Sequence, residues 1–490
     1  MSRKSLWLLT LLILTGTFLR LFKFDHTLLL ESDQAMAFLL ANRIINFGHI
    51  LLVGPNTSFY GVNILPPTYY YIVTLIYFFW RSELGVSLAF TFIGIMSIPL
   101  IFLLAKEMAL SAKTALIAAF FYTFSFTLIK YSRNIWEPHF VPFFVIIALY
   151  FAHKALNRKN FPLLLLSIFL FFISLMYVSS FLILPAFFFL TYSVLIKIDS
   201  DSTPPFLINF YIYILFFALF YFPNISFELT NNFPSLNPMR DFPVSESGNY
   251  LRNINTQFSV FLHSFLPINT GPVFATIIIF LLFITIPYLR KNLHLKWISY
   301  TLISAILLIG IYQRDAYPHR WSAIYPLFIL LVSYFFSQFP KFVIFPFMFI
   351  FIYSNFNYYR FYISTNKSDE IKSSVEIAEF ILKDSGGKSF SIFTDTPYNH
   401  TNYNTVYYVF LMEKLAGKPL YLLHPSGNWI DAGLNTNNRN IYLICEDYSI
   451  NYFETLCQNK FIMEYNFGQP QETAFYIKKK TIYKFRGLGN

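Results

Sequence analysis

Charged side chains are scarce in this chain of 490 residues, and their scarcity excludes an ordinary soluble protein. Asp, Glu, Lys and Arg together supply 12% of the residues, whereas hydrophobic residues supply 56% and aromatic residues 21%. A soluble protein carries about 25% charged residues. The few charges gather in short clusters between long apolar runs, which is typical of a polytopic membrane protein with a more polar C-terminal tail.

Cysteine is rare, and several catalytic signatures are missing. Only Cys445 and Cys457 occur, which excludes a disulfide framework but leaves one disulfide open if the tail is exported. The sequence has no Walker motif, no GxSxG elbow, no His/Cys cluster with metal-ligand spacing and no internal repeat. It has no arginine-rich run or basic-aromatic repeat either, so the net charge of +11 does not indicate nucleic-acid binding. The cofactor stays unknown: a divalent metal is possible, but the residues do not require one.

About eleven apolar runs have roughly the 16 to 22 residues that a helix needs to cross the hydrocarbon of a bilayer. They are residues 5–22, 84–105, 113–130, 136–153, 161–177, 179–197, 206–223, 272–289, 297–312, 321–338 and 342–359. The first run follows Ser2-Arg3-Lys4 and lacks a small-residue cleavage site, so we interpret it as an uncleaved span. The shorter run Pro66–Trp80 could cross as a twelfth span, or enter the interface and return.

Basic residues favour a topology in which Pro66–Trp80 does not cross. The basic clusters between the spans then fall on the side of Arg3 and Lys4, as the positive-inside rule requires. These clusters are Lys106/Lys113, Lys154/Arg158/Lys159, Lys197, Arg290/Lys291/Lys296 and Lys341. The N-terminus is predicted to be cytoplasmic. The extracytoplasmic side is predicted to hold the C-terminus and the segments Lys23–Pro67, Ser132–His139, Asn224–Gly271 and Gln313–Arg320.

The tail is predicted to form a separate domain, residues 361–490, after a transmembrane module of residues 1–360. Its expected helices are Asp369–Lys383, which is followed by a turn at Gly386-Gly387, and Tyr403–Leu415. Its expected strands are Lys388–Thr394, Leu420–Leu423, Asn440–Cys445 and Ala474–Phe485. Alternating elements of this kind predict a small α/β domain on the extracytoplasmic side.

Two carboxylates, Glu31 and Asp33, stand at the start of a helical pattern in the first long polar stretch. The apolar stripe of this pattern consists of Met36, Leu40, Ile44 and Phe47. Asp33 shares a neighbouring row with Ala37 and Ala41, which predicts a shallow groove with a carboxylate at its mouth. The alternative is a plain helix start with Ser32 or Asp33 as the N-cap.

Further motifs follow Asp33 in a recognisable order. They are Val53-Gly54-Pro55, Pro66-Pro67-Thr68-Tyr69-Tyr70-Tyr71, Tyr131-Ser132-Arg133-Asn134-Ile135-Trp136-Glu137-Pro138 and Asp315-Ala316-Tyr317-Pro318-His319-Arg320. In this order and topology the chain resembles the dolichyl-phosphate-mannose protein mannosyltransferase and aminoarabinose transferase group of GT-C glycosyltransferases, of glycosyltransferase family 39 type. The likeness is strongest over about residues 25–200.

The resemblance implies a helical membrane module with a catalytic acid in the first outer loop. It also implies a sugar donor linked to a polyprenyl phosphate, and a glycan, lipid or protein acceptor that is glycosylated on the outer face. Asp33 matches the catalytic acid. The usual Asp-Glu pair is Asp33-Gln34 here, so the second carboxylate is either displaced or supplied by Glu31 or Glu137. The implied location is the plasma membrane, of a bacterium in our interpretation.

The chemistry suits these residue types. Attack on an anomeric carbon needs a base for the incoming hydroxyl, and its transition state resembles an oxocarbenium ion, so a carboxylate serves both needs. The leaving phosphate needs cationic partners. The candidates are Arg133, His319 and Arg320, although arginines at span ends commonly snorkel to the interface.

Three aromatic residues are candidates for a substrate groove, namely Tyr69, Tyr70 and Trp136. Aromatic belts at membrane interfaces look the same in sequence. Glu137 has the alternative of a helix-start acid, because Pro138 suits a first turn.

Two other functions remain open. A secondary transporter has a similar number of spans, but it should show paired halves and ionisable residues near the midplane. Here the polar residues cluster in outer segments, which favours the enzyme. A non-catalytic relative is the other alternative, because Gln34 replaces the expected Glu.

Overall fold

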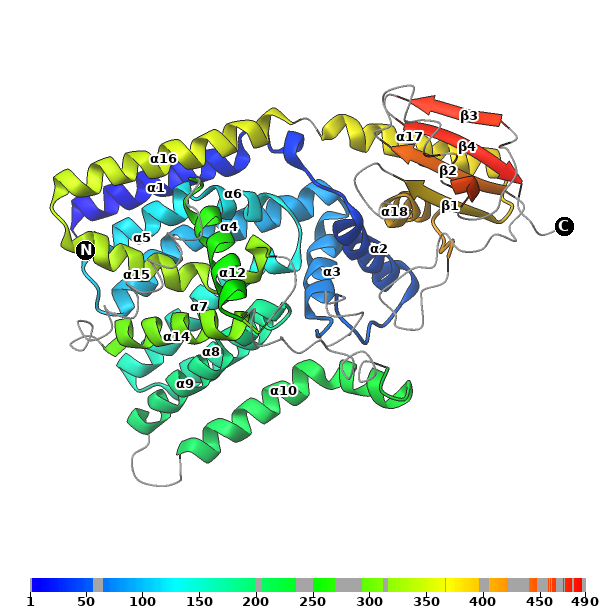
Figure 1. Ribbon diagram of the computed structural model, residues 1–490. Helices are drawn as coiled ribbons and strands as arrows, with labels where there is room; N and C mark the ends of the chain where they lie inside the picture. The colour runs from blue at the N-terminus through cyan, green and yellow to red at the C-terminus, as the bar shows by residue number, and fades with distance from the viewer. Residues whose placement is uncertain are drawn as a thin grey trace. The chain divides into compact units, whose positions relative to one another are not determined.

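The structure is a computed structural model (Figure 1) that falls into two compact units. The described residues are 2–55, 65–198, 205–234, 250–268, 293–311, 316–365, 367–395, 405–421, 440–446, 457, 459, 461–463, 470, 472–477 and 480–486. Unit 1 comprises Met1–Phe24, Gly54–Tyr69 and Val86–Thr365. Unit 2 comprises Asp25–Val53, Tyr70–Gly85 and Asn366–Asn490.

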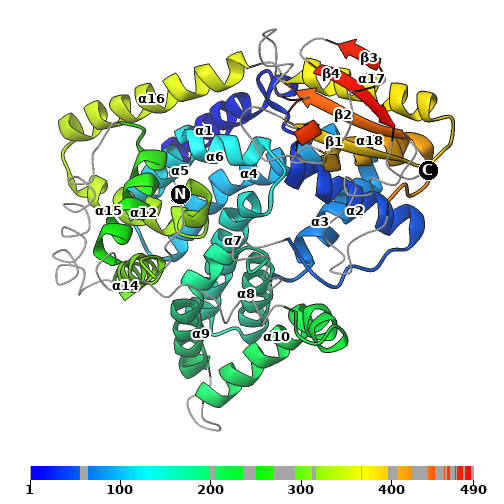
Figure 2. The ribbon, with the colours of Figure 1, turned by 45° about the vertical axis from the view of Figure 1, so that its right-hand side comes forward.

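Unit 1 is built from helices. They are α1 (Arg3–Leu21), α4 (Glu83–Glu107), α5 (Ala112–Phe124), α6 (Phe126–Arg133), α7 (Glu137–Arg158), α8 (Phe161–Ser174), η2 (Val178–Leu182), α9 (Leu184–Ile198), α10 (Pro205–Thr230), α12 (Tyr250–Phe265), α14 (Leu293–Ile309), η5 (Pro318–Trp321), α15 (Tyr325–Gln338) and α16 (Lys341–Ser364). Figure 2 shows α7 and α8 side by side, as expected of helices joined by a short link.

Among the described residues, five helices are long and apolar enough to cross a membrane: α1, α4, α7, α10 and α16. The pair α5 and α6 adds a sixth if it is one span, and it is bent by 60° within the predicted span 113–130. Shorter apolar helices, α8, α9, α14 and α15, lie in four other predicted spans. The predicted span 272–289 lies outside the described residues. The helical, polytopic class is confirmed, whereas the number of crossings stays a prediction.

One predicted loop is wrong in part. The range Asn224–Gly271 was expected to link two spans, but α10 continues to Thr230 and α12 occupies Tyr250–Phe265. The helix α12 buries Ile254, Phe258 and Phe261 at helical spacing, which gives it a firm place in the core of unit 1.

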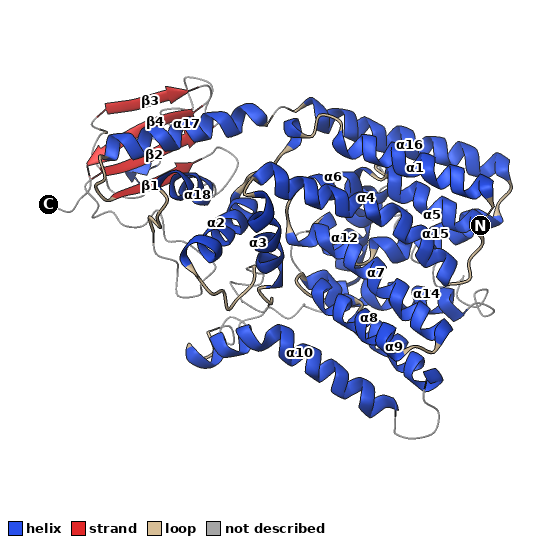
Figure 3. Ribbon diagram, turned by 180° about the vertical axis from the view of Figure 1, so that it is seen from behind, coloured by secondary structure: helices blue, strands red, loops and turns tan. Residues whose placement is uncertain are grey.

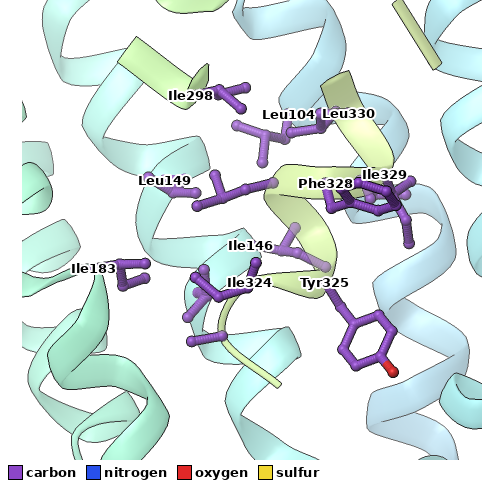
Figure 4. Packing of buried hydrophobic residues seen from close by; sticks show 14 of the residues in the cluster. Leu104, Ile146, Leu149, Ile183, Ile298, Ile324, Tyr325, Phe328, Ile329 and Leu330 are labelled. Carbon is purple, nitrogen blue, oxygen red and sulfur yellow. The ribbon is translucent and has the colours of Figure 1, made fainter. Parts of the chain in front are cut away.

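Aromatic and branched apolar side chains fill the core of unit 1. Figure 4 shows Leu104 of α4, Leu149 of α7 and Phe328 of α15 in this cluster. A close approach between α4 and α6 requires a glycine, since a Cβ at Gly94 would lie 2.2 Å from Cβ of Ser132.

Unit 2 joins the helices η1 and α2 of the first polar stretch, and most of the apolar helix α3, to the tail. Its elements are η1 (Asp25–Thr27), α2 (Ser32–Phe47), α3 (Thr68–Trp80), α17 (Ser368–Ser385), β1 (Phe390–Asp395), α18 (Thr405–Ala416), β2 (Asn440–Glu446), β3 (Glu472–Ile477) and β4 (Lys480–Arg486). The sheet, drawn in red in Figure 3, has the order β1-β2-β4-β3. Strands β1 and β2 are parallel and flank α18 in sequence, whereas β4 pairs antiparallel with both β2 and β3.

The tail therefore has an α/β fold, with two corrections to its predicted strands. The expected strand Ala474–Phe485 is a pair of antiparallel strands, β3 and β4. Residues 420 and 421 of the expected strand Leu420–Leu423 are not in a strand, and the other two lie outside the described residues. The turn after α17 is as predicted, because Gly386 ends the helix with a φ of 57°. Cys445 and Cys457, which the sequence left open, form a disulfide.

Candidate functional site

Asp33 lies in the first turn of α2. The sequence suggested Ser32 or Asp33 as the N-cap, but neither residue is. Glu31 takes that position, without a side-chain hydrogen bond to the helix end. The Asp33 side chain is exposed, while nearly all residues from Ser32 to Arg43 around it are buried. The carboxylate is thus an open polar group on an otherwise covered helix.

The surroundings of Asp33 shift its protonation. Although the carboxylate reaches solvent, many protein atoms surround it, and this partial desolvation together with the negative charge of Glu31 raises its pKa to about 6. At neutral pH the carboxylate is therefore mostly ionised, with a pKa close to the operating pH. That combination suits a general base.

The predicted groove along Ala37 and Ala41 is not present, because both side chains are fully buried. The helix α18 packs along α2 within unit 2, where the Phe38 ring stacks on Phe410 with centroids 5.7 Å apart. The Phe38 ring also lies 5.8 Å from that of Tyr77 in α3. Small side chains on α2 therefore serve close packing rather than substrate access.

A buried ion pair that the sequence did not reveal joins α2 to α18. The Arg43 guanidinium donates to both carboxylate oxygens of Glu413. The distance is 3.0 Å from Nε to Oε2 and 2.5 Å from Nη2 to Oε1. Nη2 also donates to the Tyr421 carbonyl at 2.7 Å, and the Leu420 N–H donates to Glu413 at 2.8 Å. This network fixes the helix that carries Asp33 to the tail domain. Sequence offers little signal for it, because the partners are 370 residues apart.

Arg133, predicted to bind the donor phosphate, is engaged inside unit 1. It is fully buried at the end of α6, and its Nη atoms donate to the carbonyls of Leu19 (3.1 Å), Phe22 (3.0 Å) and Lys23 (2.8 Å). The guanidinium also lies 5.5 Å from the Phe24 ring. These contacts satisfy carbonyls at the C-terminal end of α1, so they support a structural role and not the predicted phosphate contact.

A second cluster of predicted residues does come together in unit 1. The rings of Trp136 and His319 lie 4.5 Å apart, and Tyr317 stacks on His319 at 5.3 Å. The Arg320 guanidinium lies 5.0 Å from the Tyr317 ring. Glu137 follows Trp136 in the first turn of α7 and is buried, in agreement with the helix-start alternative. This group of Trp136, Glu137, His319 and Arg320 is called the α7–η5 cluster below.

His319 is not the cation that the sequence suggested. Burial, then the positive charges of Arg320 and Lys130, lower its pKa to about 3, so the imidazole is neutral at physiological pH. The same effect identifies Lys130 as a cation close to the α7–η5 cluster. Sequence reasoning missed Lys130, although it lies one helical turn before Arg133.

The two tyrosines of the predicted groove are core residues. Tyr69 is almost fully buried, with the centroid of its ring 6.5 Å from that of Phe140 in unit 1. Tyr70 is buried within unit 2. Neither presents a free ring face to a substrate, whereas Trp136 is only half-buried.

The described residues offer neither a metal site nor a cavity at the predicted site residues. No group of three or more His, Cys, Asp or Glu side chains among them could hold a metal ion. A narrow cavity in unit 1 is lined by residues of α4 to α7, including Ser97, Tyr131 and His139, but by none of the predicted site residues.

Comparison with solved structures reveals likenesses over the whole chain. ArnT from Cupriavidus metallidurans in the apo state matches with a TM-score of 0.62 and 9% identity, over 99% of this chain and 98% of that one. The same protein bound to undecaprenyl phosphate matches with a TM-score of 0.63 and 9% identity, over 97% of both chains. Archaeal oligosaccharyltransferase AglB from Archaeoglobus fulgidus, in complex with an inhibitory peptide and a dolichol-phosphate, matches with a TM-score of 0.50 and 12% identity, over 93% of this chain and 71% of that one.

ArnT, an aminoarabinose transferase, and AglB are both GT-C glycosyltransferases. This chain has the GT-C fold. The resemblance seen in the sequence is confirmed at the level of fold. No protein-family model matches the sequence, and no curated protein matches it.

Proposed function

We propose that the protein is an inverting membrane glycosyltransferase. It moves a sugar from a polyprenyl-phosphate donor to a hydroxyl of an acceptor on the extracytoplasmic face, with Asp33 as the base. The observation that carries this proposal is the open Asp33 carboxylate, with its pKa raised to about 6, on a first-loop helix of a GT-C fold. A secondary transporter is less well supported, because both compared proteins are transferases.

The proposed reaction needs one proton acceptor and one stabilised leaving group. The Asp33 carboxylate takes the proton of the acceptor hydroxyl while the oxygen attacks the anomeric carbon from the face opposite the phosphate. The bond between that carbon and the phosphate oxygen breaks, and polyprenyl phosphate leaves with the electron pair. Positive charge develops on the sugar ring in the transition state, and a nearby carboxylate stabilises it.

The α7–η5 cluster is proposed to bind the donor phosphate, with a changed set of residues. Arg320 and Lys130 supply positive charge. The neutral imidazole of His319 can donate one hydrogen bond to a phosphate oxygen. Trp136 offers a half-buried ring to the sugar or lipid. Arg133 is omitted, because its donors already serve the end of α1. Glu137 and Glu31 stay as candidates for the second carboxylate.

The proposed orientation places the reaction outside the cytoplasm. The distribution of Lys and Arg supports a cytoplasmic N-terminus. The disulfide between Cys445 and Cys457 supports an extracytoplasmic tail, because disulfides persist in oxidising compartments.

The decisive experiment compares Asp33→Asn with a matched control. Asn keeps the shape of the side chain but cannot accept the proton, so transfer should fall by about a hundredfold or more. The control is Asp25→Asn in η1, which removes a carboxylate that is 65% exposed and outside the site. Membranes from cells that express each variant are analysed for glycolipids and glycans by mass spectrometry. Near-normal transfer by a well-expressed Asp33→Asn protein would rule out Asp33 as the base.

A further inference from the structure

Two histidines meet inside unit 1, near the C-terminal end of α7. The rings of His153 in α7 and His294 in α14 have centroids 4.7 Å apart, and their planes lie at 78° to each other. His153 is fully buried, whereas His294 is half-buried. We call these two residues the His pair. Glu137 of the α7–η5 cluster stands at the opposite end of α7, so the His pair is separate from the proposed reaction site.

The imidazole of His153 is a polar group that the protein around it leaves unsatisfied. Its Nδ1 and Nε2 atoms are both buried, and neither has a hydrogen-bond partner. Buried polar atoms are nearly always hydrogen-bonded, and an exception calls for a specific explanation, such as a bound ion or water. The helix α7 is also a candidate membrane span, in which ionisable side chains are rare and commonly functional.

The second ring against His153 belongs to Trp297, which cannot satisfy it. The two ring centroids lie 6.2 Å apart. The indole Nε1–H of Trp297 already donates to the Ala186 carbonyl at 2.9 Å, and an indole nitrogen is not an acceptor. His294 is therefore the neighbouring ring whose nitrogens can share a ligand with His153.

The separation of the two imidazoles suits a shared metal ion. With Zn–N bonds of about 2.0–2.1 Å and a tetrahedral angle at the ion, two imidazoles have ring centroids about 5 Å apart. A water that accepts or donates over about 2.9 Å to each ring would hold the centroids about 6 Å apart or more. The observed 4.7 Å matches the ion and not the water. Imidazole nitrogen is a preferred ligand of Zn²⁺ and of other first-row transition metals.

The charges beside the His pair permit a cation. Lys197 lies close enough to His294 to act on it electrostatically, but this lysine is exposed, so water and salt screen its charge. Lys154, the next residue after His153, directs its ammonium to the Tyr150 hydroxyl at 3.1 Å. The exposed part of His294 gives an ion a path from water.

We propose that the His pair binds one transition-metal ion of the Zn²⁺ class, through one ring nitrogen of each histidine. The described residues contain no group of three or more side chains of the metal-binding kinds, so water fills the remaining coordination positions. The ion clamps α7 to α14. This inference goes beyond the proposed function and does not depend on it, because the reacting groups of that proposal lie elsewhere.

Metal-dependent stability of the full-length protein tests the site. The purified protein, without an affinity tag and stripped of metal by a chelator, is dialysed against Zn²⁺ and then unfolded by heat. The wild type should take up one Zn²⁺ per chain and gain several degrees in Tm, because an ion that binds the native state stabilises it. Mg²⁺ should leave Tm unchanged, since it prefers oxygen ligands. His294→Gln should abolish both zinc effects, whereas His263→Gln, which removes an exposed imidazole of α12, should keep them.

X-ray absorption at the zinc edge tests the ligands without relying on a variant. The wild-type spectrum should contain the scattering of two imidazoles, with Zn–N distances of about 2.0–2.1 Å. Zinc that still binds to His294→Gln, or a spectrum without two imidazoles, would place the ion elsewhere and overturn the proposal. A wild-type protein that takes up no Zn²⁺ would overturn it as well, and would leave the two rings as packing partners.

Discussion

At the residue scale, the protonation of Asp33 makes the activity depend on pH. Because burial and Glu31 raise its pKa to about 6, transfer should rise with pH through about 6 and level off above it. Glu31→Gln removes the second cause of the shift, so the acidic limb of the pH profile should move to lower pH. The plateau rate should fall as well only if Glu31 supplies the second carboxylate. A pH–rate profile of both proteins checks this. An acidic limb that does not move would show that Glu31 acts otherwise than by its charge.

The same residue shows how far the sequence reaches at this scale. The position of Asp33 after the first span, together with the family resemblance, led to its selection, and its role stays a prediction. Sequence could not tell an arginine that serves carbonyls, as Arg133 does, from one that faces a substrate, because both stand at the end of a span. The neutral state of His319 was hidden as well. It arises from burial, then from the charges of the neighbouring Arg320 and of Lys130, which is remote in sequence.

At the element scale, the pair Arg43–Glu413 is expected to decide whether α2 keeps its place on α18. Glu413→Gln leaves the buried Arg43 charge without its carboxylate, which typically costs about 3–5 kcal/mol. Lys414→Gln is the matched control, because its partly exposed pair with Glu83 is worth about 1 kcal/mol or less. Thermal unfolding of the purified proteins should show a large decrease in Tm for Glu413→Gln and a small one for the control.

The double variant Arg43→Met/Glu413→Met separates charge from packing. It removes both buried charges and keeps apolar bulk, so it should recover most of the lost stability. If Glu413→Gln unfolds at the wild-type temperature, the pair does not hold α2.

Elements with a uniform apolar character were the easiest to predict. The helices α1, α4, α7, α10 and α16 coincide with predicted spans because each one is hydrophobic over most of its length. The helix α12 contains no continuous apolar run and was not predicted, because only one of its faces is apolar. Its buried residues Ile254, Phe258, Phe261 and Phe265 do show helical spacing in the sequence.

At the scale of the whole molecule, the amino-acid composition predicts the membrane module, but it does not predict which segments of the chain make up unit 2. Segments 25–53 and 70–85 belong to the same compact unit as the tail, although hundreds of residues separate them in sequence. Such long-range packing depends on particular contacts, such as those between Phe38 and Phe410, and no local pattern encodes it. The predicted division into a membrane module, residues 1–360, and a tail domain, residues 361–490, stays a prediction.

Topology is the property of the whole molecule on which the proposed function depends most. If the tail is extracytoplasmic, Lys372→Cys, exposed on α17, should react with a membrane-impermeant maleimide in intact cells. Lys106→Cys, exposed near the end of α4, should react only after the cells are permeabilised. The native pair should stay unreactive until reduced, because Cys445 and Cys457 are bonded.

Replacing one half of the disulfide supplies the control for that last statement. Cys445→Ser leaves Cys457 with a free thiol, which should then react after denaturation without any reductant. The variant should also unfold at a lower temperature, since a disulfide that closes a loop of 12 residues stabilises by roughly 3 kcal/mol or less. Labelling of Lys372→Cys only after permeabilisation would place the tail, and Asp33 with it, on the cytoplasmic side. In that case the donor and acceptor of the proposed reaction would have to be sought there.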